Sequence, residues 1–240
     1  IKLMNGSSRS IAIKKNIIAS LFLKGISILV SLQVVPLTIN YINPTRYGIW
    51  LTLSSIVAWL SYFDLGFAHG FRNRFAEAVA KGDMQLAREY VSTTYVVLSL
   101  LFSSVFLIAI VVNHFVDWSA ILNVDAAYSS ELNIVFGILA FFFCLNIVAS
   151  IFTTMLTANQ KPALASLIQT LGQVFGFICI YILTKTVPGN LDVLAFAFSG
   201  VPCFLLIIIS IGMFLSGRYR HLSPSFHFVH FSLTKKIVGL

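Results

Sequence analysis

Long stretches of apolar residues, free of charged side chains, follow one another along this chain. They cover residues 25–45, 47–63, 90–116, 132–160, 162–184 and 193–217. A helix needs roughly 20 apolar residues to cross the hydrocarbon core of a bilayer. Five of the six stretches meet that length, and Asp64 placed at the membrane interface would extend the short one. The pattern predicts an all-α integral membrane protein with six transmembrane helices, over residues 11–40, 46–66, 88–113, 131–156, 162–184 and 191–215.

The segments between these predicted spans are short. Asn43 and Pro44 end the first span before the second begins. The residues after Gly70 predict a short amphipathic helix that turns the chain along the inner membrane surface; Gly82 stops it, and Asp83 caps the next helix. We divide the chain into a six-helix lobe, residues 1–217, and a cytoplasmic amphipathic segment, residues 218–240, which leads towards a further span.

Composition supports the membrane class. Of the 240 residues 58% are hydrophobic and only 10% charged, whereas about a quarter are charged in a soluble domain. A net charge of +8 could indicate nucleic acid, but the charge is distributed by side. With the N-terminus in the cytoplasm, 13 Lys and Arg residues fall on the inner side, against Arg46 and Lys185 on the outer side. This bias is typical of the positive-inside rule, so we expect a multi-pass protein with a cytoplasmic N-terminus and no nucleic-acid partner.

Polar residues form stripes on three of the predicted spans. The stripes comprise Ser20, Lys24, Ser27, Ser31 and Thr38; Asn146, Ser150, Thr153 and Thr157; and Ser166, Gln169 and Gln173. Each set recurs at helical spacing and so shares one helix face. Two interpretations stay open: the stripes surround a hydrated space, or they hold helices together. On the fifth span, Gly172 and Gly176 have the GxxxG spacing of closely packed helices.

Lys24 is the most informative single residue, because it lies eight residues, or about 12 Å, into the first span when counted from Asn16. It either lines a path for an anionic substrate such as a phosphate, or its long side chain extends back to the inner interface. For Asp64 three roles stay open: partner of a cation, ion-linked gate, or hydrated structural residue. For Arg72 and Arg74 two roles stay open: binding of an anionic headgroup, or fixing the topology. The candidate residues of a substrate path are Lys24, Ser31, Asp64, Arg72, Arg74, Asn146, Gln169 and Gln173.

Signals for an enzyme are weak. The sequence has neither a Walker A loop nor a G-x-S-x-G nucleophile elbow. His221, His227 and His230 have no carboxylate or Cys nearby, and the three cysteines each fall inside a predicted span. We expect no catalytic residue, no metal site and no cofactor.

Three segments carry a resemblance to a known family. They are YGIW (47–50), the FDLGF, GFRNRFAEA and KGD pieces of residues 63–83, and YVSTTY (90–95). Over roughly residues 15–100 the chain resembles the N-terminal part of Wzx-type polysaccharide flippases, the O-antigen translocases of the multidrug/oligosaccharidyl-lipid/polysaccharide exporter superfamily.

The resemblance implies one lobe of a two-lobed exporter in the bacterial inner membrane, with this chain a fragment that lacks the second lobe. It implies a flippase that moves undecaprenyl-pyrophosphate-linked oligosaccharide repeat units for O-antigen and lipopolysaccharide biosynthesis, with Lys24 available to the pyrophosphate. Implied partners are the lipid-linked oligosaccharide, membrane lipids, a polysaccharide polymerase and other glycan-assembly membrane proteins. Two alternatives stay open: a drug exporter of the same superfamily, and a non-transporting membrane scaffold for glycan-assembly partners.

Overall fold

The chain folds into helices joined by short turns. The computed structural model describes the backbone of residues 2–64 and 66–238, and the side chains of residues 15–60, 62 and 66–238. Within these residues there is no strand. The long helices are α1 (Lys2–Ile42), α4 (Met84–Phe115), α6 (Ser129–Ala158), α7 (Pro162–Thr186) and α8 (Leu191–Leu215). The shorter elements are α2 (Pro44–Ala58), α3 (Phe67–Lys81), α5 (Trp118–Leu122), α9 (Ser232–Val238) and the 3-10 helices η1 (Trp59–Asp64), η2 (Ala126–Tyr128), η3 (Arg220–Leu222) and η4 (Phe226–Phe228).

Side-chain caps fix where several helices begin. The Asn43 side chain accepts a hydrogen bond from the Arg46 backbone N–H at 3.0 Å, and Pro44 occupies the first turn of α2. The Asp83 carboxylate accepts from the Leu86 N–H at 2.9 Å, directly after α3 ends at Gly82. Both caps satisfy backbone donors that a helix start leaves without an intrahelical partner. The predicted stop at Gly82 and the cap at Asp83 are confirmed.

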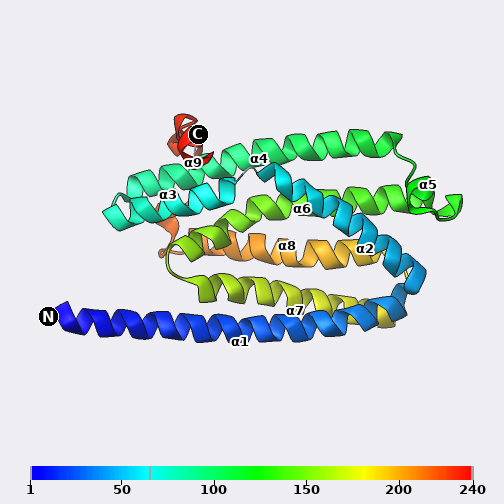
Figure 1. Ribbon diagram of the computed structural model, residues 1–240, viewed down its shortest axis with the longest axis horizontal. Coiled ribbons are helices and arrows are strands. Elements are labelled where there is room, and N and C mark those ends of the chain that lie inside the picture. The colour runs from blue at the N-terminus through cyan, green and yellow to red at the C-terminus, as the bar shows by residue number, and fades with distance from the viewer. Residues whose placement is uncertain (1, 65, 239–240) are drawn as a thin grey trace.

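The five long helices lie side by side with their axes roughly aligned, in the order α4, α6, α8, α7 and α1 (Figure 1). Contacts between each neighbouring pair agree with this order. The shorter α2 crosses the layer obliquely and contacts α1, α6 and α8. The N-terminus, the turn between α3 and α4, and the turn between α6 and α7 all lie at one end of the bundle (Figure 1).

In the described residues, five helical segments are long and apolar enough to cross a membrane. They are Lys15–Ile42, Met84–Phe115, Ala126–Ala158, Pro162–Thr186 and Leu191–Leu215. These segments match five of the six predicted spans to within a few residues, so an all-α, multi-pass membrane protein is the class that the structure indicates. Six spans are not confirmed.

The predicted span 46–66 is divided into two helical elements. Its α-helical part, α2, has 15 residues, which corresponds to about 22 Å and is shorter than the roughly 30 Å hydrocarbon core. The chain then tightens into η1 before α3 begins. Together α2, η1 and α3 carry the chain from one end of the bundle back to the other (Figure 1).

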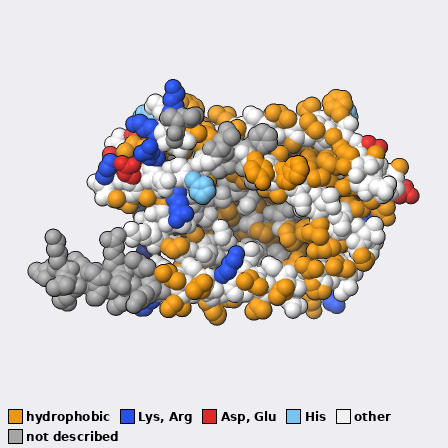
Figure 2. Space-filling view, viewed as in Figure 1, with side chains coloured by type: hydrophobic (Ala, Val, Ile, Leu, Met, Phe, Trp, Pro, Cys, Tyr) orange, Lys and Arg blue, Asp and Glu red, His pale blue; other side chains and the backbone are white. Residues whose placement is uncertain are grey.

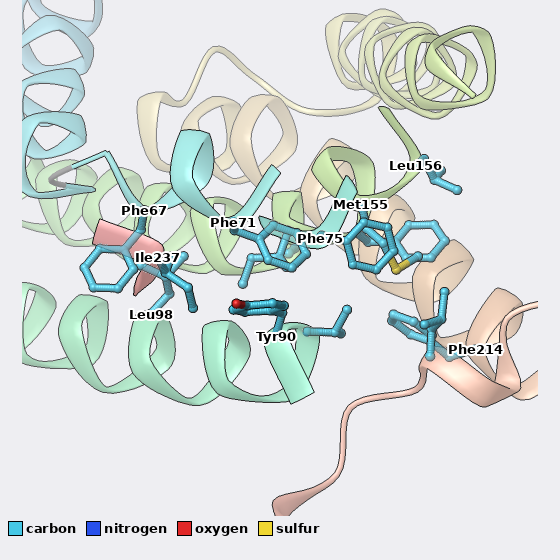
Figure 3. Close-up of a cluster of buried hydrophobic side chains, with 14 of the residues drawn as sticks. Phe67, Phe71, Phe75, Tyr90, Leu98, Met155, Leu156, Phe214 and Ile237 are labelled. Atoms are coloured by element: carbon cyan, nitrogen blue, oxygen red, sulfur yellow. The ribbon is translucent and has the colours of Figure 1, made fainter. Parts of the chain in front are cut away.

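The helix α3 has the predicted amphipathic character, but it lies lengthwise against α4 rather than across the end of the bundle (Figure 1). Its apolar face is buried: Phe71 and Phe75 are fully buried and pack with Tyr90 and Leu98 of α4 (Figure 3). Burial of such aromatic side chains is a large part of what holds helices together in an aqueous environment. At this end of the bundle the same cluster reaches Met155 and Leu156 of α6 (Figure 3).

Close packing of α7 on α8 depends on the predicted GxxxG pair. Gly172 and Gly176 are buried against Pro202 of α8. A Cβ atom at Gly172 would lie 3.2 Å from the Cα and Cβ atoms of Pro202, closer than an ordinary van der Waals contact. The missing side chain therefore lets the two helix backbones approach closely.

The segment after α8 does not lie free of the bundle. Buried Ser92 and Thr93 of α4 accept hydrogen bonds from the backbone N–H groups of Ser225 and His230, at 3.1 and 3.0 Å. The Arg88 guanidinium donates to the Ser223 carbonyl at 2.9 Å. These contacts fasten residues 218–238 to α3 and α4. Their amphipathic composition alone did not predict this.

Candidate functional site

A polar cleft lies between α1 and α7. It has a volume of about 450 Å³ and is lined by Ile17, Ser20, Leu21, Lys24, Ser27, Pro162, Ser166, Gln169, Thr170 and Gln173. Apart from Thr170, which the sequence prediction did not include, the polar members come from the two predicted stripes on the first and fifth spans. Residues three, four and seven apart share one face of a helix, so each stripe faces the other across the contact of α1 with α7. The face drawn in Figure 2 is hollowed above α1, with hydrophobic side chains around the hollow and charged side chains gathered mainly over α3.

Lys24 contributes the positive charge of this cleft. Its side chain is exposed, and no described side chain forms an ion pair or a hydrogen bond with it. It lies well inside the segment Lys15–Ile42, which is long and apolar enough to span a membrane. An ammonium group at such a depth is costly to leave in hydrocarbon, so its opening into a polar cleft is the arrangement that physical chemistry favours.

A hydroxyl of the α1 stripe and the hydroxyl of Thr170, which lies beside the α7 stripe, join α1 to α7. Ser27 Oγ and Thr170 Oγ1 are hydrogen-bonded at 3.1 Å, and Thr170 Oγ1 donates to the Leu23 carbonyl at 3.4 Å. Thr170 is buried, while Gln169 and Gln173 on the same helix are exposed and form no hydrogen bond with a described residue. On α1, Ser27 of the stripe therefore joins helices, whereas Gln169 and Gln173 of the α7 stripe stay open in the cleft.

A second, apolar pocket adjoins the polar cleft. Its volume is about 310 Å³, and it lies between α1, α2, α7 and α8. Gln173 lines both spaces, and Ser31 lines the apolar one. The Ser31 hydroxyl donates a hydrogen bond to the Ser27 carbonyl at 2.9 Å, one turn back along α1, so it has no further proton to donate to a ligand in the pocket.

Aromatic side chains line the apolar pocket. Tyr47 and Trp50 come from α2, and Phe177 and Phe198 come from α7 and α8. The rings of Trp50 and Phe198 meet edge to face with centroids 4.6 Å apart. The sequence prediction missed these residues. The one available signal was the i, i+3 spacing of Tyr47 and Trp50 in YGIW, which places both rings on one face of α2.

The remaining predicted residues lie elsewhere. Arg74 donates from Nε to the Lys236 carbonyl at 3.1 Å and from Nη1 to the Glu77 carboxylate at 3.2 Å, so it fastens α9 to α3. Arg72 is exposed on α3, and Asn146 is exposed on α6, away from both spaces. The side chain of Asp64 lies outside the described residues. The structure brings together Lys24, Gln169 and Gln173, with Ser31 in the adjoining pocket.

Several charged groups outside the spans have structural partners. Hydrogen bonds from Lys81 and Arg74 lower the pKa of the Glu77 carboxyl, and the same bond to Glu77 raises the pKa of Lys81. At the other end of the bundle, a hydrogen bond from the Ser119 hydroxyl lowers the pKa of Asp117, which caps α5. Among the described residues, no group of three or more His, Cys, Asp or Glu side chains is placed to hold a metal ion.

The fold and the two spaces define the class of this chain: a helical, multi-pass membrane protein with a polar cleft that adjoins an apolar pocket. Comparisons with models of known families, with curated proteins and with solved structures gave no match.

Proposed function

We propose that this chain is the N-terminal lobe of a flippase that moves undecaprenyl-pyrophosphate-linked oligosaccharide units across the bacterial inner membrane for O-antigen synthesis. The observation that carries the proposal is Lys24: a cation without a described partner, in a polar cleft, inside a predicted span. The resemblance of residues 47–50, 63–83 and 90–95 to the Wzx-type flippases supports the same conclusion.

In this proposal the cargo is recognised by its charge. The ammonium of Lys24 attracts a pyrophosphate oxygen, and this attraction is stronger inside a membrane span than in bulk water because the effective dielectric constant is lower there. The amide groups of Gln169 and Gln173 supply donors and acceptors for phosphate oxygens or sugar hydroxyls along the same cleft. A second lobe closes the opposite side, and alternating access, driven by an ion gradient, carries the headgroup across.

The test is genetic complementation. In a strain that lacks its O-antigen flippase, the full reading frame should restore surface polysaccharide, and Lys24→Ala should reduce that rescue at least tenfold. Lys24→Arg keeps the charge and should retain most of it. Lys185→Ala is the matched control, because Lys185 lies at the opposite end of α7 and lines neither space. Immunoblots must show equal amounts of each protein in the membrane.

Rescue by Lys24→Ala equal to the parent would remove Lys24 from the mechanism. A gain in tolerance to many drugs, without restored polysaccharide, would favour a drug exporter instead.

A further inference from the structure

We propose that the apolar pocket between α1, α2, α7 and α8 holds the hydrocarbon chain of the lipid whose pyrophosphate lies at Lys24. The inference rests on the proposed function, since it takes the cargo to be a polyprenyl pyrophosphate. The proposed function places only the pyrophosphate of the cargo, at Lys24; this inference also places the first isoprenoid units of its tail, in the apolar pocket.

The two spaces follow one another in the order that such a lipid requires. Gln173 lines both, so they are contiguous along α7. Along α1, Lys24 lines the polar space and Val34 the apolar one, about 15 Å apart at 1.5 Å per residue. A lipid with its head near the inner side extends its tail towards the middle of the membrane, and the step from Lys24 to Val34 has the same direction.

The lining of the pocket fits a hydrocarbon chain better than a sugar. Its walls are formed mainly by aliphatic and aromatic side chains, among them Val34, Leu51, Trp50 and Phe198. A sugar site needs several converging donors and acceptors. Here Ser31 already donates within α1, and no described residue that lines the pocket is charged. The other polar groups, on Gln173, Tyr47 and Trp50, are few beside the apolar wall. A volume of about 310 Å³ is enough for part of a hydrocarbon chain, and the rest of a long tail remains in the bilayer.

Charge decides between a neutral hydrophobic molecule and a charged lipid. Lys24 is the one cation among the described residues that line the two spaces. A neutral ligand would leave the Lys24 ammonium unpaired. A lipid with an anionic head would pair with Lys24 in the polar cleft and fill the apolar pocket with its tail. The occupant that fits is therefore an anionic lipid, and the proposed function makes it an isoprenoid pyrophosphate.

Short isoprenoid pyrophosphates separate the contribution of the head from that of the tail. Isopentenyl diphosphate presents the head with five carbons, and farnesyl diphosphate adds ten more. The purified full chain in detergent should bind farnesyl diphosphate about tenfold or more tightly than isopentenyl diphosphate, because burying additional apolar carbon is favourable. Titration calorimetry measures both affinities.

Two variants fill the pocket from different helices: Val34→Trp from α1, and Leu51→Trp from α2, where Leu51 is 44% exposed and tolerates a larger side chain. Each should abolish most of the preference for farnesyl diphosphate and leave isopentenyl diphosphate binding within twofold. The matched control is Leu29→Trp, on an outward face of α1 where Leu29 is 66% exposed; it should keep the preference. Thermal unfolding must show that each variant is folded.

The inference is overturned if both pocket variants keep the farnesyl preference while Lys24→Ala still weakens isopentenyl diphosphate. If Lys24→Ala leaves both ligands unaffected, the proposed function and this inference fail together.

Discussion

Some Lys and Arg side chains of this chain have an interaction partner within the fold, and others have none among the described residues. Six Lys and Arg side chains contact an acidic group, a hydroxyl, a carbonyl or an aromatic ring within the chain: Arg46, Arg74, Lys81, Arg88, Lys161 and Lys185. The described ones without such a contact lie at or beyond the ends of the spans, where water solvates them, except for Lys24. An unpaired charge at a membrane surface needs no explanation, but one inside a span indicates a function.

Arg88 tests how the C-terminal segment is held. Its guanidinium donates to Ser223 and lies over the Phe228 ring, 4.2 Å from the centroid. Arg88→Lys removes the planar group that makes these contacts at once, and should weaken the docking by about 1–2 kcal/mol. Limited proteolysis should then cut residues 218–231 faster than in the parent protein. Arg72→Lys, on the exposed face of α3, is the control; equal cleavage of both variants would contradict the assigned role.

Among the helices, α7 connects the site to the rest of the bundle. One face joins α1 through Thr170, another packs on α8 through Gly172 and Gly176, and between them Gln169 and Gln173 open into the cleft. The shape of both spaces therefore depends on how closely α7 approaches its two neighbours.

Gly172→Leu should separate α7 from α8. The new side chain would meet the backbone of Pro202, which cannot move aside as a flexible side chain can, and overpacking of this kind costs about 1–3 kcal/mol. Thermal unfolding of the detergent-purified protein should show a lower Tm. Gly212→Leu provides the comparison, because nothing lies within 4 Å of a Cβ atom at that position of α8. If the two variants unfold at the same temperature, close packing at Pro202 is not what stabilises the pair.

At the scale of the whole molecule, α2, η1 and α3 together cross the bundle, so that α4 starts at the same end of the bundle as α1 (Figure 1). In the part of the chain that the structure describes, five segments qualify as spans, yet this path brings the chain back to the end where it began (Figure 1). With the positive-inside bias, the bundle predicts that Arg72 lies in the cytoplasm and Lys185 outside.

Cysteine labelling in intact cells tests this orientation. In a chain whose native Cys144, Cys179 and Cys203 are replaced by alanine, Lys185→Cys should react with a membrane-impermeant maleimide, and Arg72→Cys should react only after the cells are opened. Both positions are exposed, so neither is protected by the fold. Labelling of Arg72→Cys in intact cells would show that α2 and α3 do not return the chain to the cytoplasm.

The sequence predicted the long helices well, because a span depends on local apolar length. It also placed Lys24, Gln169 and Gln173 on polar stripes, since each stripe follows from the period of its own helix, but it left open whether the stripes surround a hydrated space or hold helices together. The sequence could not predict which polar residues join α1 to α7 and which stay open in the cleft. Ser27 meets Thr170 only in one register of α1 against α7, and that register is not encoded locally. Likewise Ser92 receives the backbone of Ser225 across 133 residues of sequence, a contact that no local pattern encodes.

The shortness of α2 also bears on how the protein is made. A helix of 15 residues is a poor substrate for insertion into a membrane by itself. The tight turn at Asn43 and Pro44 joins it directly to the much longer α1. We therefore expect α1 and α2 to enter the bilayer as one hairpin, with the first helix supplying most of the driving force for both. Lengthening the turn between them would then impair biogenesis while leaving every contact of the finished cleft intact.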